Sequence, residues 1–230
     1  MPKVLLTSSP RRPRGQELLS RAQPLSEAFF DRDPRLVARD LLGKLLLRRI
    51  EGKLRAGRIV ETEAYLGADD AAAHAAAGRT ERNAVLFGPP GRAYVYLSYG
   101  LHYCLNVSCL PDGEAGCLLF RALEPVAGLP LMAHARGIKL LKSDLRDPRK
   151  LRLLASGPAR LCQALEITRH VDNGKDMTSP ASGLWLADDD FRPREIQTSP
   201  RIGITKSADL PLRYFIAGNP YVSVQRTSSE

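Results

Sequence analysis

Two segments of this sequence combine acidic and aromatic side chains at spacings that could build a binding site. The first, residues 59–66, contains Glu63 and Tyr65, and the second, residues 93–97, contains Tyr94 and Tyr96. Because alternate side chains of a β-strand point to the same face, each pair would share one face of its strand. Aromatic walls beside a carboxylate are what an enzyme needs to hold a base taken out of its stack and to attack the bond to its sugar.

Four further residues near these strands could complete such a site. Tyr99 lies at the end of the second strand, where a side chain can project outward, and His74 and Asn106 offer polar groups to the edge of a base. Arg121 ends an otherwise apolar strand. A buried arginine needs an acidic partner, and Glu63 is a candidate for that partner.

Ordinary structural roles are alternatives for some of these residues. Glu63 shares its face with Glu61, and the two could form a solvent-exposed pair, but a large aromatic such as Tyr65 on the same face favours stacking against something. His74 taken alone is typical of a helix surface. Tyrosine packs well on sheets, and we assign Tyr94 to the core as the most ordinary of the three tyrosines.

The absence of lysine from the segment that contains the candidate residues indicates the type of reaction. No lysine occurs between Arg58 and Arg121, and an amine is what an enzyme would use to form a Schiff base with a sugar. The 4 cysteines of the chain show neither metal-ligand spacing nor a disulfide pattern, which predicts reduced, mostly buried thiols. We therefore expect a reaction that uses water, without a cofactor or a metal.

The charge of the chain is concentrated in two blocks. The chain has 230 residues with 34 basic and 25 acidic side chains, a formal charge of +9, which favours a polyanionic partner. Residues 1–24 carry five basic side chains against one acidic, and residues 136–160 carry eight against two. We interpret the second block, which precedes the turn at Gly157, as an edge that faces phosphates; a solvated helix face is the alternative.

The first half of the chain shows the elements that would position the site. We expect residues 1–24 to be a disordered basic arm and residues 25–230 to form one domain. Asp33 should cap a helix that ends near Gly43. The other expected elements are strands over 44–50 and 54–66, a short alanine-rich helix over 71–77 that carries His74, and strands over 93–97, 104–109 and 116–123 that form an antiparallel meander.

The second half is predicted to contain helices followed by short strands. Helical pieces should cover 129–152, and the turn at residues 156–158 should open a helix that reaches about residue 167, whose N-terminus offers amides to a phosphate. The expected strands lie over 183–186, 202–204, 212–217 and 221–224.

The ordered set of these residues resembles the alkyladenine (3-methyladenine) DNA glycosylase family, from Phe29 to Val224. Its most specific segments are residues 58–67 (RIVETEAYLG), the tyrosines 94, 96 and 99 before Gly100, Asn106, residues 119–125 (LFRALEP) and residues 156–165 (SGPARLCQAL). Such a set is hard to reproduce by chance. The resemblance implies an α+β fold: a single domain with a curved, mostly antiparallel, open-barrel-like sheet surrounded by helices.

The resemblance also implies a role for each candidate residue. Glu63 corresponds to the general base that activates water, and Arg121 to the residue that helps to hold that water. The remaining assignments are a base-binding pocket of Tyr65, His74, Tyr96 and Asn106, a DNA-intercalating wedge at Tyr99, and phosphate contacts from Arg79, Thr80, Arg82, Gly157 and Arg160.

Three positions depart from the family pattern. The loop around Arg79 and Thr80 is a residue shorter, Ser98 replaces an apolar residue, and His102 stands where an aromatic is usual. These departures affect the phosphate contacts and the range of substrates, and they leave the chemistry intact.

The implied activity is the removal of alkylated purines, and in some members of deaminated ones, from duplex DNA, which would initiate base excision repair. We expect a monomer whose partner is duplex DNA with damaged purines. The sequence shows no apolar run of bilayer length and no signal peptide. We therefore expect no membrane contact and a cytoplasmic location, or a nuclear one in a eukaryote.

Two other functions stay open at this point. One is a non-catalytic nucleic-acid-binding module that stacks single-stranded bases or tRNA on its tyrosines. The other is a barrel of the formyltransferase C-terminal type that recognises tRNA. Glu63 argues against the first, because a carboxylate beside a stacking surface would repel phosphates. Release of a free base from alkylated DNA would separate the three functions.

Overall fold

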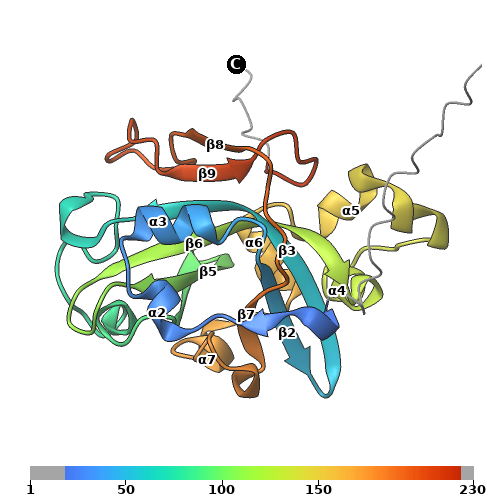
Figure 1. Ribbon diagram of the computed structural model, residues 1–230, viewed down its shortest axis with the longest axis horizontal. Helices are drawn as coiled ribbons and strands as arrows, with labels where there is room; N and C mark the ends of the chain where they lie inside the picture. The colour runs from blue at the N-terminus through green and yellow to red at the C-terminus, as the bar shows by residue number, and fades with distance from the viewer. Residues whose placement is uncertain (1–18, 224–230) are drawn as a thin grey trace, which may run out of the picture.

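The computed structural model describes residues 19–223. Residues 1–18, most of the predicted basic arm, lie outside the described residues. Within the described part, the strands form a single sheet that does not close, and each strand pairing is antiparallel. This sheet and its surrounding helices confirm the expected α+β fold (Figure 1).

The strand order places the predicted meander at one end of the sheet. The order is β1-β7-β2-β3-β6-β5-β4, and the additional β8–β9 pair joins the sheet through β3. The bounds of the strands are β1 Gln23–Pro24, β2 Leu45–Ile50, β3 Lys53–Tyr65, β4 Ala93–Ser98, β5 His102–Cys109, β6 Gly116–Ala127, β7 Leu184–Asp188, β8 Ile196–Ser199 and β9 Arg213–Ile216.

The long strand β3 belongs to two parts of the sheet at once. Its first half pairs with β2, its last residues pair with β9, and its other edge follows β6. Register shifts on either side of Glu61 mark bulges, which bend a strand and re-aim its side chains. Thr62 donates from Oγ1 to the carbonyl of Ala38, so this side of β3 faces α3 (Pro34–Asp40), and Glu61 and Glu63 face the opposite side.

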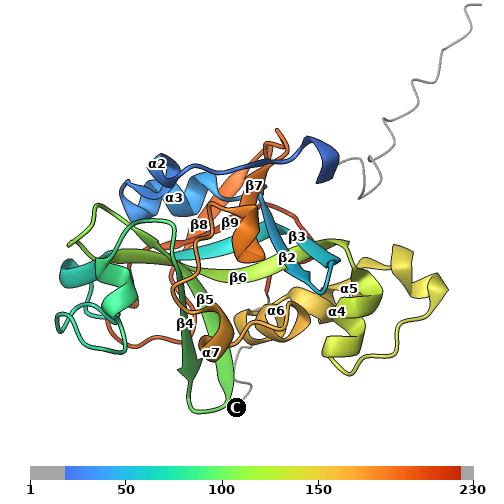
Figure 2. The ribbon, with the colours of Figure 1, turned by 90° about the horizontal axis from the view of Figure 1, so that it is seen from below.

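The helices cover both faces of the sheet. In Figure 2, α2 (Glu27–Phe30) and α3 lie on one side of the central strands and α4 (Leu129–Ala135), α5 (Pro148–Ala155) and α6 (Pro158–Ala164) lie on the other. The side chain of Asp33 accepts a hydrogen bond from the Arg35 amide, which confirms the predicted cap of α3. The remaining helical segments are α7 Arg169–Asp172 and the 3₁₀ turns η1 Gly67–Asp69, η2 Ala84–Phe87, η3 Lys142–Arg146 and η4 Pro180–Ser182.

The predicted alanine-rich helix over 71–77 is wrong. This segment consists of successive turns whose amides bond to the carbonyl three residues earlier, as Ala73 does to Asp70 and Ala76 does to Ala73. Asp70 accepts the Ala72 amide as a helix cap would, but contacts with other segments hold the residues after it in turns: the side chain of Asn83 donates to the carbonyls of His74 and Gly78, and the His74 ring bonds to the Tyr94 hydroxyl. His74 therefore lies on a turn.

The C-terminal part of the chain was predicted less well than the rest. Strands at β7 and β9 are present, but residues 202–204 and 221–223 are irregular, Val224 lies outside the described residues, and β8 was not expected. The segment 200–212 runs between two paired strands and crosses the end of β3 that carries Glu63.

All four cysteines are buried free thiols, as expected. Between residues 19 and 223 there is no helix with the length and apolar character needed to cross a membrane.

Candidate active site

The carboxylate of Glu63 is buried among three donors. Its Oε1 accepts the Ile202 amide at 2.8 Å and pairs with the Arg121 Nη1 at 3.0 Å, and its Oε2 accepts the Tyr65 hydroxyl at 3.1 Å. Glu63 is 0% exposed. Strand alternation brings Tyr65 to the same side, as predicted, and β6 supplies Arg121 from the adjacent strand.

Glu61 has a different environment from Glu63, although both are fully buried on the same face. Glu61 accepts hydrogen bonds from the Arg121 Nε at 2.9 Å, from the Arg213 Nε at 2.7 Å, and from the amide and hydroxyl of Ser223. The charges of Glu63 and Glu61 raise the pKa of Arg121 against the opposing effect of burial. Glu61 is therefore saturated by protein donors, and Arg121 is held between the two carboxylates.

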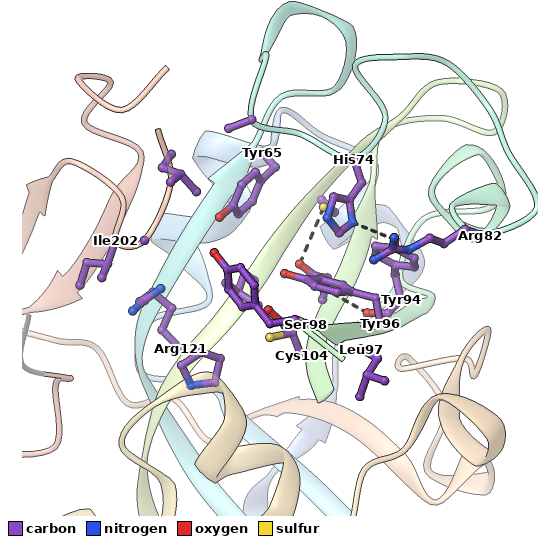
Figure 3. A pocket seen from close by; sticks show the side chains of 18 residues that line it. Tyr65, His74, Arg82, Tyr94, Tyr96, Leu97, Ser98, Cys104, Arg121 and Ile202 are labelled. Atoms are coloured by element: carbon purple, nitrogen blue, oxygen red, sulfur yellow. Dashed lines mark hydrogen bonds between the residues drawn. The ribbon is translucent and has the colours of Figure 1, made fainter. Parts of the chain in front are cut away.

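A cavity of about 460 Å³ opens beside this carboxylate pair, within the usual range of about 300–1,000 Å³ for small-ligand sites. In Figure 3, Tyr65 and Ile202 lie on one side of it and His74 and Arg82 on the other. Its lining includes the predicted pocket residues Tyr65, His74, Tyr96 and Asn106, with Arg121 and Tyr99.

Glu63 itself does not line the cavity, whereas Tyr65, Arg121 and Ile202, which surround its carboxylate, all do. The carboxylate thus lies one layer behind the cavity wall.

Two tyrosines and His74 form an aromatic cluster at the opposite wall. The rings of His74 and Tyr96 are 4.4 Å apart at an interplanar angle of 70°, and the His74 Nδ1 lies 2.9 Å from the Tyr94 hydroxyl. Tyr94 is only 1% exposed, in agreement with its assignment to the core, but its hydroxyl also orients the pocket histidine.

The pKa values of these groups favour neutral side chains in the cavity. Loss of water around the ring, together with the positive charge of Arg82, lowers the pKa of His74 below its ordinary 6.5. Burial raises the pKa of Tyr94 to about 12, and burial together with the charge of Glu63 raises the pKa of Tyr65. At neutral pH the Tyr65 hydroxyl therefore keeps its proton and donates a hydrogen bond to Glu63.

The two remaining residues of the predicted pocket and wedge differ in exposure. Asn106 is 3% exposed and donates its Nδ2 to the Tyr94 carbonyl at 3.2 Å, which fixes the orientation of the amide. Tyr99 is 91% exposed at the tip of the β4–β5 hairpin, with a positive φ of 49°. The fold brings Asn106 into the pocket wall and leaves the Tyr99 ring projecting from its rim.

The predicted phosphate contacts do not form one cluster. Arg79 and Thr80 are exposed beyond the cavity, whereas Arg82 lines it, with its guanidinium 6.0 Å from the Tyr96 ring centre. The Gly157 amide donates to the Arg121 carbonyl at 2.9 Å, so it is not free for a phosphate. Arg160 donates to the Ser156 carbonyl and is partly exposed.

Sequence reasoning missed the contribution of the segment that follows β8. Arg201 and Ile202 contact Tyr65 and Glu63 respectively. Neither residue is distinctive in type or spacing, and residues 202–204 were assigned to a strand. Only the three-dimensional path of this segment identifies them.

The cavity has aromatic walls and is backed by a buried carboxylate and an arginine, and the match to a family model identifies the class of the protein as a DNA glycosylase. The comparisons define the family. The sequence model of the family described as "Methylpurine-DNA glycosylase (MPG)" matches residues 28–220, and the chain belongs to this family.

Relatives along almost the whole chain carry the same name, "Putative 3-methyladenine DNA glycosylase". The protein from Koribacter versatilis (strain Ellin345) is 64% identical over 208 residues, which cover 90% of this chain and 97% of the relative. The proteins from Methanoculleus marisnigri (strain ATCC 35101 / DSM 1498 / JR1) and Alkaliphilus oremlandii (strain OhILAs) are 48% and 41% identical, each over 86% of this chain and 98% of the relative.

Proposed function

We propose that this protein flips alkylated purines, and as a second class deaminated purines, out of duplex DNA and hydrolyses their N-glycosidic bonds with a water that Glu63 activates. It acts as a monofunctional glycosylase that starts base excision repair. The names of the relatives support the alkylated purine as substrate. We also propose that it works as a monomer, since one chain carries the whole cavity.

The observation that carries this proposal is the position of the Glu63 carboxylate directly behind an aromatic cavity. Tyr65 and Tyr96 offer flat faces against which a purine can stack. Arg121 and the Tyr65 hydroxyl join the cavity to the carboxylate. A surface that only stacked single-stranded bases would gain nothing from a buried acid at this place, because the acid repels phosphates.

The geometry leaves Glu63 the capacity to bind a water. A carboxylate offers about four acceptor sites, and the donors of Ile202, Arg121 and Tyr65 use three of them. A water that donates to the remaining site can be deprotonated as it attacks the sugar. The negative charge of Glu63 also stabilises the cation-like sugar of the transition state.

The leaving base needs different help in different lesions. An N-alkylated cationic purine leaves without protonation, and cation–π contact with the aromatic walls adds roughly 0.5–2 kcal/mol. A neutral base needs a hydrogen bond or a proton. His74, which is neutral at pH 7 and oriented by the Tyr94 hydroxyl, supplies a hydrogen bond at the wall where a purine edge would lie.

Binding of the duplex combines a wedge with phosphate contacts. Extrusion of a base costs a few kcal/mol, less for a damaged or mispaired one. The exposed ring of Tyr99 fills the vacated space, and Arg79, Thr80, Arg82 and Arg160 hold the backbone on either side.

The test is a product assay on a panel of duplexes, each with one 3-methyladenine, 7-methylguanine, hypoxanthine or ethenoadenine. We expect free base from at least the alkylated purines and no covalent protein–DNA adduct when borohydride is added, because no amine attacks the sugar. Binding of all duplexes without base release would instead support a non-catalytic module, and a trapped adduct would reject the water-only mechanism.

A further inference from the structure

A fully buried ion pair lies behind the active site and takes no part in the steps above. Arg201 contacts both carboxylate oxygens of Asp70, from Nη1 at 2.5 Å and from Nη2 at 2.8 Å, and neither side chain has any exposed surface. The two residues are 131 positions apart in the sequence. The pair thus joins the segment after β8 to the turn that follows β3.

The guanidinium of Arg201 also supports Tyr65. Its carbon lies 4.6 Å from the centre of the Tyr65 ring, and its Nη1 donates to the carbonyl of Ala64 at 3.0 Å. Tyr65 lines the cavity and Arg201 does not. Arg201 therefore packs on the Tyr65 ring from the protein interior, and a base in the cavity would meet the ring from the other side.

Both ends of the ion pair continue to groups of the active site. The residue after Arg201 is Ile202, whose amide holds the Glu63 carboxylate at 2.8 Å. Asp70 accepts the amides of Leu66 and Ala72, and its carbonyl accepts the Ala73 amide, which fixes the start of the turns that carry His74.

We propose that Arg201 is a positioning residue for base excision: paired with Asp70, it sets Tyr65, the Ile202 amide and the His74 turns relative to one another and so fixes the Glu63 carboxylate behind the cavity. This inference rests on the proposed function. A buried ion pair adds little net stability compared with apolar residues of the same size, but it requires one geometry. Here the ion pair between Arg201 and Asp70 positions the Tyr65 ring, the Ile202 amide and the turns that carry His74.

The expected effect is on the chemical step. A shift of about 1 Å in a reacting group can lower a rate on the order of 100-fold. Without the guanidinium, the Tyr65 ring and the Ile202 amide are free to move away from Glu63. We therefore expect Arg201→Met to lower the single-turnover rate of base release by about 10- to 100-fold, with only a few-fold weaker binding of the lesion duplex.

The chain offers a matched control. Arg48 and Asp172 form another buried pair, with Nη1 of Arg48 2.7 Å from the aspartate, which also pairs with Lys175, and neither Arg48 nor Asp172 lines the cavity. Arg48→Met removes the same kind of side chain from the same kind of environment. A purely structural ion pair at Arg201 would make the two variants behave alike when each is compared at a temperature where it is folded.

The experiment measures single-turnover base release and lesion-duplex affinity for wild type, Arg201→Met, Arg48→Met, Arg201→Lys and Asp70→Asn. The proposal predicts a rate loss for both Arg201 variants and for Asp70→Asn, smaller for Arg201→Lys, which keeps the charge, and a rate within about 2-fold of wild type for Arg48→Met. If Arg201→Met does not fold, the rates of base release by Arg201→Lys and Asp70→Asn test the positioning role instead.

Equal rates for the Arg201, Asp70 and Arg48 variants would overturn the positioning role. A wild type that releases no base from any duplex would overturn the proposed function instead, so the two failures are distinguishable.

Discussion

At the scale of single residues, the structure separates two glutamates that the sequence presents as a pair. Glu61 is surrounded by Arg213 and Ser223, which lie outside the cavity lining, and by the Nε of Arg121, the residue that it shares with Glu63. Glu63 contacts the groups that form the cavity wall. The same side-chain chemistry therefore stabilises the fold at one position and is available for catalysis at the other.

This difference predicts distinct results for the two substitutions. Glu61→Gln removes the shared partner of two buried arginines, and breaking such a buried arrangement typically costs about 3–5 kcal/mol. We expect urea unfolding to shift to much lower concentration for Glu61→Gln than for Glu63→Gln. If the two variants unfold at the same urea concentration, Glu61 does not have the structural role assigned here.

The pKa of His74 should be lowered by the burial of its ring and by the positive charge of Arg82. Because its folded-state pKa lies below 6.5, the folded protein binds fewer protons at this ring than the unfolded chain does. The stability that the folded protein gains from a neutral His74 is fully present above pH 6.5. It is lost as the pH falls towards the folded-state pKa of His74. In an NMR titration, the pKa of His74 should lie below its ordinary value of 6.5, and Arg82→Gln should move the pKa of His74 upward.

An unchanged His74 pKa in Arg82→Gln would contradict the electrostatic coupling across the cavity. Glu81→Gln is a suitable comparison, because Glu81 is exposed beside Arg82 but does not line the cavity.

At the scale of elements, the sequence predicted well whatever depends on local periodicity and caps. The Asp33 cap, the strands of the meander and the shared face of Glu63 and Tyr65 all follow from patterns a few residues long. The turns that carry His74 did not follow the alanine-rich composition, because Asn83 binds the carbonyls of His74 and Gly78 and the Tyr94 hydroxyl binds the His74 ring. Composition does not encode a contact of that kind.

The tight turn after β3 yields an element-scale prediction. Gly67 has a φ of +82°, and a Cβ added there would lie 1.8 Å from the carbonyl oxygen of Ala115. Gly67→Ala must displace the turn that leads out of Tyr65, and we expect a loss of stability well above that of Gly78→Ala. Gly78 also has a positive φ, but its Cβ would meet open space, so the backbone strain alone should cost about 1 kcal/mol.

Thermal unfolding of the two variants checks this prediction. Equal melting temperatures would show that the approach of Ala115 does not constrain the turn.

At the scale of the whole molecule, the sheet and its two helical layers form a frame that brings β3, β4, β6 and the segment around residue 202 to one cavity (Figures 1 and 3). The sequence identified the aromatic and polar residues of the cavity wall, such as Tyr65, His74 and Tyr96, but it did not show that Glu63 is buried behind that wall. It also missed Arg201 and Ile202, because their function depends on a chain path without local signals.

The recognition of duplex DNA can be tested at the exposed hairpin tip. Tyr99→Ala should weaken binding to a lesion duplex by about 1–3 kcal/mol, the usual value of one stacking contact, and should weaken single-strand binding much less. Its ring is 91% exposed, so stability should hardly change. Equal losses for the duplex and the single strand, measured by fluorescence anisotropy at one fixed salt concentration, would argue against a wedge.

The most direct test of the account is the substitution Glu63→Gln, which keeps the size of the side chain and removes its capacity to act as a base. The two quantities to measure are single-turnover release of 3-methyladenine or 7-methylguanine and affinity for the same lesion duplex. We predict that base release is abolished while binding survives. Release at close to the wild-type rate by folded Glu63→Gln would contradict the assignment of Glu63 as the group that activates water.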